Sequence, residues 1–165
     1  MSSTTPLIFI VGAGPGIGLA VARRFAREGF AIALIARPDE NLALFEADLR
    51  AAGSPHIQCW AADINDTEAL KPILHLLQAE TITPKVLVYN ASGGADALPS
   101  SLSQEALAVA LQINVQAPLA LAQAVLPAMR KARRGTILFT GGGLALEPKA
   151  NQAALSLGKS ALRSL

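Results

Sequence analysis

The chain has 165 residues, of which 52% are hydrophobic and only 4% aromatic, and its formal net charge is +2. This length suits one domain with a sizeable core, so we expect residues 1–165 to form a single domain. A charge this small does not by itself indicate an acidic partner. Cys59 is the only cysteine, which excludes an internal disulfide, and no cluster of cysteine and histidine indicates a metal site. These features favour a reducing cytoplasm.

Two further partner classes are not expected. The first six residues lack the basic segment of a signal peptide, and the apolar run at 7–11 is far too short to cross a membrane. The longer apolar stretch at 107–129 is interrupted by Gln, Asn and Pro, so we expect no membrane span. The one basic cluster, at 130–134, closes a predicted helix, where cations complement the helix dipole. We therefore expect no binding to nucleic acid.

Short aliphatic runs alternate along the chain with longer amphipathic segments. Pro118 is expected to bend the fourth and longest helix near its middle. Alternation of this kind forces parallel strands joined by right-handed crossovers, and strands this apolar suit a sheet covered by helices on both faces. The sequence therefore predicts an α/β protein with a doubly wound, Rossmann-like parallel sheet. We expect strands at 7–11, 31–36, 56–61, 85–89 and 135–140, and helices at 16–28, 39–52, 66–79, 102–132 and 151–165.

Glycines dominate the turn between the first strand and the first helix. Their spacing is G-x-x-x-G-x-G, at Gly12, Gly16 and Gly18, whereas the commoner G-x-G-x-x-G would need glycine where Ile17 stands. A turn too tight for Cβ atoms lets backbone N–H groups and the start of a helix approach a pyrophosphate. A purely structural turn is the alternative, but the position after the first strand of a βαβ unit favours nucleotide binding.

This loop resembles the TGxxxGIG motif of the short-chain dehydrogenases/reductases, with Val11 in place of the threonine. In that family an acidic residue at the end of the second strand selects NAD, whereas a small residue followed by a basic one selects NADP. Here Ala36 leaves out the carboxylate that would repel a 2′-phosphate, and Arg37 offers a planar fork that can hold one. The resemblance therefore favours NADP(H) over NAD(H), with a solvated arginine as the alternative.

Later landmarks of the family follow in order along the chain. The resemblance implies that Asp63 hydrogen-bonds the adenine with Ile64 beside the ring, although an Asp after a strand is also common as a turn or capping residue. Asn90 and Ala91 match the family's Asn-Asn-Ala-Gly element beside the cofactor. The full set of expected cofactor-binding residues is Gly12, Pro15, Gly16, Ile17, Gly18, Arg37, Asp63, Ile64, Asn90, Ala91 and Lys159.

The catalytic residues of the family are only partly matched. Its members use a serine after the fifth strand, a Tyr-x-x-x-Lys pair on the next helix and an asparagine in the long helix. Asn114 and Lys159 match the asparagine and lysine, but Gly142 and Leu155 stand at the serine and tyrosine positions. The possible substitutes Thr140 and Ser156 do not replace the tyrosine, because an alkyl hydroxyl is a far weaker acid than a phenol. Asn114 and Lys159 are therefore interpreted as catalytic remnants, Asn114 as a structural helix residue and Lys159 as a contact to the cofactor ribose.

Two functional hypotheses remain open. The first is an NADP(H)-dependent oxidoreductase of carbonyl or alcohol substrates that uses a divergent proton donor. The second is a non-catalytic dinucleotide-binding or sensing protein. Family members usually continue through two more strands, so we expect this chain to be the N-terminal part of a longer one, or its open sheet edge to be covered by another chain. By resemblance, the helices at 102–132 and 151–165 would form a homodimer or homotetramer interface.

Overall fold

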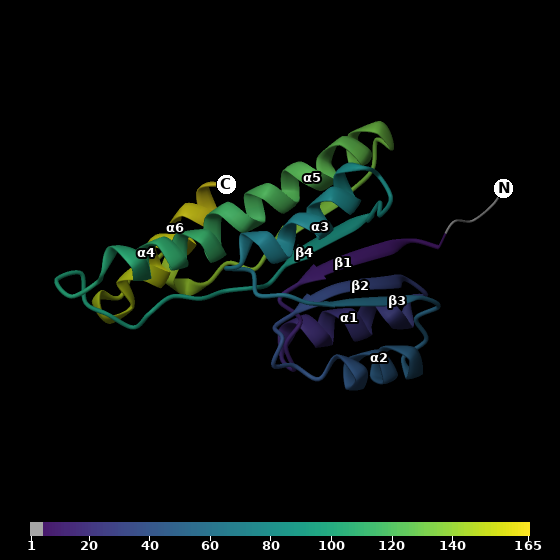
Figure 1. Ribbon diagram of the computed structural model, residues 1–165, viewed down its shortest axis with the longest axis horizontal. Coiled ribbons are helices and arrows are strands. Elements are labelled where there is room, and N and C mark those ends of the chain that lie inside the picture. Colours follow the sequence, from purple (N-terminus) through teal and green to yellow (C-terminus); the bar gives the residue numbers. More distant parts are fainter. Residues whose placement is uncertain (1–4) are drawn as a thin grey trace.

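The computed structural model describes residues 5–165; residues 1–4, which belong to the segment in which we expect no targeting signal, lie outside the described part. Five strands form one parallel sheet in the order β3-β2-β1-β4-β5 (Figure 1). From β1 the chain first adds β2 and β3 on one side and then β4 and β5 on the other side, as in other doubly wound sheets. The predicted fold class is confirmed. The strands are β1 (Leu7–Val11), β2 (Ala31–Ala36), β3 (Ile57–Ala61), β4 (Val86–Tyr89) and β5 (Thr136–Phe139).

Burial differs between the central strands and the edges of the sheet. β2 is buried along its whole length, and β1 is buried apart from its first residue. By contrast, β3 and β5 have no fully buried residue, and Leu138 in β5 is half exposed. Continuous apolar runs suit the centre because helices cover both faces there. The carboxyl ends of β1 and β4 lie side by side, with Val11 opposite Tyr89, and this is where the strand order reverses.

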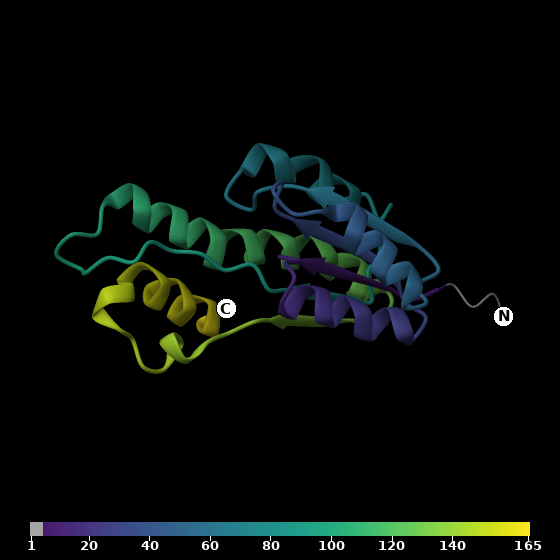
Figure 2. The same cartoon turned by 90° about the horizontal axis from the view of Figure 1, so that it is seen from below.

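Helices cover both faces of the sheet (Figures 1 and 2). On one face, α1 (Ile17–Arg27) and α2 (Leu42–Ala51) cover a core that includes Ile10 and Leu34. On the other face, α3 (Thr67–Gln78) and α5 (Ala117–Lys131) cover a core that includes Phe9 and Tyr89. The last helix, α6 (Ala153–Ser164), packs beside α4 (Gln104–Leu111).

Side-chain caps explain where several helices begin. Asn41 accepts a hydrogen bond from the backbone N–H of Leu44, so α2 starts at Leu42 rather than at the predicted residue 39. Asp66 and Ser103 cap α3 and α4 in the same way. The predicted helix at 151–165 begins with a 3₁₀ turn, Ala150–Gln152 (η3), and a second such turn, Gly143–Ala145 (η2), follows β5. The helices thus lie where expected, with ends shifted by one to three residues.

The long helix predicted at 102–132 consists of three parts. Between α4 and α5 lies a π-helical segment, Gln112–Gln116 (η1), which ends just before Pro118. The whole run Gln104–Lys131 is long and apolar enough to cross a membrane by length and composition alone. Its apolar side chains have another use, however, because Leu121 and Val125 are fully buried in the core against the sheet. The helix is a core helix of this fold.

Candidate functional site

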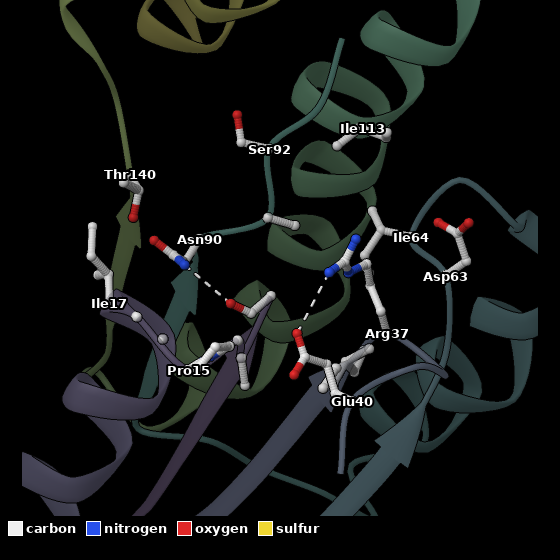
Figure 3. Close-up of a pocket in the computed structure, with 18 of the residues that line it drawn as sticks. Pro15, Ile17, Arg37, Glu40, Asp63, Ile64, Asn90, Ser92, Ile113 and Thr140 are labelled. Carbon is white, nitrogen blue, oxygen red and sulfur yellow. Dashed lines mark hydrogen bonds and ion pairs between the residues drawn. The ribbon is translucent and has the colours of Figure 1, made fainter. Parts of the chain in front are cut away.

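A cavity of about 640 Å³ opens at the carboxyl ends of the strands, beside the reversal of strand order between β1 and β4 (Figure 3). Ligands of open α/β sheets bind at this point, because the loops on either side of it diverge. Segments that follow all five strands contribute to its wall, and so does α6. Every residue expected to bind the cofactor lines this cavity, namely Gly12, Pro15, Gly16, Ile17, Gly18, Arg37, Asp63, Ile64, Asn90, Ala91 and Lys159.

Two glycines of the first loop are required by the fold itself. Gly12 has a positive φ of 87°, and a Cβ added there would lie 2.4 Å from the backbone nitrogen of Ala91. A Cβ at Gly18 would lie 2.5 Å from the carbonyl oxygen of Gly12. Both contacts are with backbone, so neighbouring side chains cannot relieve them by moving. These two glycines let β1, β4 and α1 approach one another closely.

Gly16 has no comparable role in folding. Its φ of −86° is negative, and a Cβ added there would meet no atom within 4 Å. α1 begins at the next residue with no side chain capping its first turn and no acidic residue in that turn. Backbone N–H groups at a helix start need an acceptor, and the dipole there favours an anion. The glycine turn and the uncapped helix together fit the pyrophosphate of a dinucleotide.

Substitutions of Gly18 and Gly16 by alanine should have different effects on stability and on cofactor binding. We expect Gly18→Ala to lower Tm by about 5–10 °C or more, because overpacking typically costs 1–3 kcal/mol. Gly16→Ala should change Tm by no more than about 4 °C and weaken NADPH binding about tenfold or more, because the new methyl group enters space left for the ligand. Thermal unfolding and NADPH fluorescence titration measure the two effects. Unchanged NADPH affinity in Gly16→Ala would argue against a pyrophosphate at this turn.

Arg37 and Glu40 lie side by side in the lining of the cavity (Figure 3). Arg37 Nη2 is 3.6 Å from Glu40 Oε1, and Arg37 Nε is 3.5 Å from Asp39 Oδ1. Ala36, the small residue before Arg37, is buried at the end of β2. Sequence reasoning missed Glu40, although an acidic residue three positions after the expected phosphate ligand was a signal for it.

Asp63 has the turn role that was one of the two considered for it from sequence. It lines the cavity, yet its Oδ1 also accepts a hydrogen bond of 2.8 Å from the backbone N–H of Asn65. The carboxylate therefore shapes the turn after β3. The next residue, Ile64, is buried and contributes an apolar side chain to the cavity lining. An adenine contact by Asp63 stays a prediction.

Asn90 connects β4 to the glycine loop. Its side-chain Nδ2 donates a 3.0 Å hydrogen bond to the carbonyl of Gly12 (Figure 3), and its backbone N–H donates to the carbonyl of Val11 at 2.8 Å. Ala91 also donates to Val11. These bonds hold the loop at the end of β1 against the neighbouring strand, so the shape of the cavity depends on them.

Lys159 is the only residue of α6 that lines the cavity. It is only 5% exposed, and its Nζ donates a 2.9 Å hydrogen bond to the carbonyl of Thr140. Burial lowers the pKa of this amine from its ordinary value of 10.5 because water stabilises the ammonium form. A buried lysine with one acceptor therefore lowers the stability of the unliganded protein, as binding residues often do.

We expect Lys159→Met to raise Tm by a few degrees at pH 7 and to weaken NADPH binding. Because the pKa of Lys159 is lower in the folded state, burying its ammonium group reduces the free energy of unfolding, and this reduction is complete below the folded-state pKa. It disappears as the pH rises to 10.5, because Lys159 then loses its proton in the unfolded state as well. The difference in Tm between the variant and wild type should therefore narrow with increasing pH, as thermal unfolding between pH 6 and 10 can measure. A lower Tm for the variant at pH 7 would mean that the ammonium stabilises the fold.

Asn114 does not reach the cavity. It is fully buried, its Nδ2 donates to the carbonyls of Gly93 at 2.6 Å and Ala110 at 2.8 Å, and its Oδ1 accepts from Ser92 Oγ at 3.4 Å. Because a π turn shifts backbone bonding from i−4 to i−5, the Asn114 side chain supplies a donor to the carbonyl of Ala110 in the last turn of α4, just before the π-helical segment. Gly158 packs directly against it, since a Cβ there would lie 2.9 Å from Asn114 Cβ. These contacts agree with its interpretation as a structural helix residue.

The positions matched to the family serine and tyrosine also lie outside the cavity lining. Gly142 is in an extended segment, and a Cβ added there meets nothing within 4 Å. Leu155 packs against the loop after β4, with its Cβ 3.2 Å from a Cβ built at Gly94. A larger side chain therefore has free space at position 142. At position 155 the residue is partly exposed.

The one phenol of the chain is engaged elsewhere, and the two possible substitutes, Thr140 and Ser156, are alkyl hydroxyls. Tyr89, the only tyrosine, is buried in the core, donates to the carbonyl of Ile113 and has its pKa raised by burial. Ser156 accepts a 3.2 Å hydrogen bond from the backbone N–H of Lys149, in a groove between α4 and α6. Thr140 does line the cavity, where its carbonyl binds Lys159. Since Tyr89 is committed to the core, no phenol reaches the cavity.

Comparisons with known proteins agree with the site. The family model described as short chain dehydrogenase matches residues 6–165. A short chain dehydrogenase of Pseudocercospora fijiensis is 31% identical over 156 residues, which are 93% of this chain and 50% of the relative. The 2,3-dihydro-2,3-dihydroxybenzoate dehydrogenase of Bacillus subtilis is 31% identical over 155 residues, covering 94% of this chain and 59% of the relative. This chain thus spans about half to three fifths of the length of these two relatives.

Solved structures show the same fold. A metagenomic short-chain oxidoreductase in complex with NADP has a TM-score of 0.87 and 29% identity, with 96% of this chain and 72% of that chain covered. An NAD⁺-bound xylitol dehydrogenase has a TM-score of 0.85 and 28% identity, with 99% and 63% covered. The family match, the parallel sheet and the glycine turn at its centre agree, and the chain belongs to the short-chain dehydrogenase/reductase family.

Proposed function

We propose that this protein binds NADP(H) in preference to NAD(H) and is an oxidoreductase homologue whose family-type carbonyl chemistry is degraded. The observation that best supports this proposal is that the glycine turn, the uncapped start of α1 and Arg37 line the same cavity. Similar solved structures hold NADP in one case and NAD⁺ in another. The choice of cofactor therefore depends on this chain's own residues, and Ala36 and Arg37 favour a 2′-phosphate.

Each part of the cavity has a role in this proposal. The backbone N–H groups of the glycine turn hold the pyrophosphate, Arg37 holds the 2′-phosphate, and Lys159 donates to the ribose next to the nicotinamide. When bound, the cofactor would supply a hydride to a carbonyl carbon. The proton for the carbonyl oxygen is what this chain lacks, because Leu155 stands in the tyrosine position. General acid assistance is worth about 10²–10⁴ in rate, so proximity alone would leave a slow reaction.

The direct test is titration of the purified protein with NADPH and NADH, followed by cofactor fluorescence. We expect the dissociation constant for NADPH to be about tenfold lower than that for NADH, as one retained charge-assisted contact would give. Equal affinities would overturn the cofactor preference, and absence of binding by either would overturn the whole proposal. Arg37→Ala in the same titration identifies the residue responsible.

A non-catalytic dinucleotide-binding or sensing role is the second candidate. It is favoured by the cavity itself, to which no tyrosine contributes. A screen of aldehydes, ketones and enones with NADPH separates the two candidates. Turnover well above the buffer rate would support the oxidoreductase with a divergent proton donor, and no turnover despite NADPH binding would support the sensing role.

We also propose a single-domain organisation, which is supported by one sheet whose two faces each carry a hydrophobic core.

We further propose that the protein is cytoplasmic and forms a homo-oligomer. The subunit interface would use α4, α5 and α6, where Val109, Leu119 and Leu157 are partly exposed apolar side chains. Light scattering with size-exclusion chromatography tests this, and a monomer at micromolar concentration would contradict it.

A further inference from the structure

Glu40 differs from the other acidic residue beside Arg37 in its surroundings. Its side chain is only 18% exposed, whereas the side chains of Asp39 and Arg37 are each 69% exposed. Glu40 also lines the cavity, and Asp39 does not. A carboxylate that is largely removed from water interacts more strongly with nearby charges than a solvated one. Of the two acidic neighbours, Glu40 is therefore the one that a ligand charge would sense.

Backbone hydrogen bonds fix the position of Glu40, and its carboxylate lies near Arg37 and Gly14. Its N–H donates to the carbonyl of Arg37 at 3.1 Å, and its carbonyl accepts from Leu42 at 3.1 Å, so it sits in the tight turn that leads into α2. Its Oε1 is 3.6 Å from Arg37 Nη2 and 3.5 Å from a Cβ built at Gly14. The carboxylate thus lies between the basic group and the glycine turn (Figure 3).

We infer that Glu40 is a specificity-determining residue that limits the preference of this site for a 2′-phosphate. The inference rests on the proposed binding of a dinucleotide. A 2′-phosphate carries up to two negative charges near neutral pH, and it would compete with Glu40 for the guanidinium of Arg37. A cofactor with a free 2′-hydroxyl meets no such repulsion, and its hydroxyl can donate to a carboxylate. Glu40 therefore disfavours NADPH without opposing NADH.

The test uses Glu40→Gln, which keeps the size of the side chain and removes its charge. We expect NADPH and the fragment adenosine 2′,5′-bisphosphate to bind about tenfold more tightly than to wild type, while NADH and ADP change less than about threefold. Isothermal titration calorimetry on the full chain measures all four ligands without depending on catalysis. The gain should shrink between 50 and 500 mM salt, because added ions screen the repulsion.

Asp39→Asn is the matched control. It removes one negative charge from the same turn and the same guanidinium, but at a side chain that is solvated and outside the cavity. We expect its affinities for all four ligands to stay within about threefold of wild type. An equal gain in Asp39→Asn would overturn the inference, since net charge alone would then explain it. Wild-type affinity for the bisphosphate in Glu40→Gln would also overturn it.

The failure of this inference is distinguishable from failure of the proposed function. If wild type binds NADPH and Glu40→Gln binds it no better, only the role of Glu40 is wrong. If wild type binds none of the four ligands, the proposed dinucleotide site is wrong, and the inference is overturned with it. Thermal unfolding of each variant shows whether it is folded.

Discussion

Introducing Gly142→Ser and Leu155→Tyr together should raise the rate of carbonyl reduction with NADPH about 10²- to 10⁴-fold over the parent protein, the range that a positioned general acid contributes. The serine would supply a hydrogen-bond donor for the substrate carbonyl, and the tyrosine would supply the proton. Lys159 is already present four residues after position 155. A Cβ at residue 142 meets no neighbour, so the serine fits without strain. Steady-state oxidation of NADPH with a panel of aldehydes and ketones measures the gain.

Ser164→Tyr is the control for this double variant. It adds the same phenol to the same helix at an exposed position in its last turn, and we expect it to leave the rate unchanged. The single variants should gain less than the double, because the two groups act on the same carbonyl. A folded double variant that binds NADPH and shows no gain would contradict the assignment of positions 142 and 155. Fast turnover by the parent protein would contradict the degraded active site.

Arg37→Ala should weaken NADPH binding about 10- to 100-fold and leave NADH binding within about threefold. Hydrogen bonds to charged groups contribute about 1.5–3 kcal/mol, and alanine removes the whole guanidinium. Fluorescence titration with both cofactors measures the change. Arg50→Ala is the matched control, because it removes the same charge from an exposed position in the last turn of α2. Equal weakening of NADPH and NADH in Arg37→Ala would mean that the arginine does not contact the 2′-phosphate.

Sequence alone determined the order of the elements and most of the lining of the cavity. β1 and β2 have the predicted bounds, because a buried strand shows as an unbroken apolar run, and these runs end at Gly12 and Arg37. The glycine spacing at 12, 16 and 18 and the residues after each strand also identified the lining, since parallel strands bring their carboxyl ends to one edge. Both are local patterns whose spatial consequence follows from the topology.

Only the tertiary structure decided which polar side chains face the ligand and which serve the fold. Asn114 matches a catalytic position in sequence, yet it is buried and bonded to Gly93 and Ala110. Glu40 was not expected, and it lies in the cavity because the turn after β2 directs its carboxylate between Arg37 and Gly14. The sequence shows an acidic residue three positions after Arg37, but it does not show where its carboxylate points. Each outcome depends on contacts between segments that are distant in sequence or on the path of a turn, which form only when the helices and the sheet pack together.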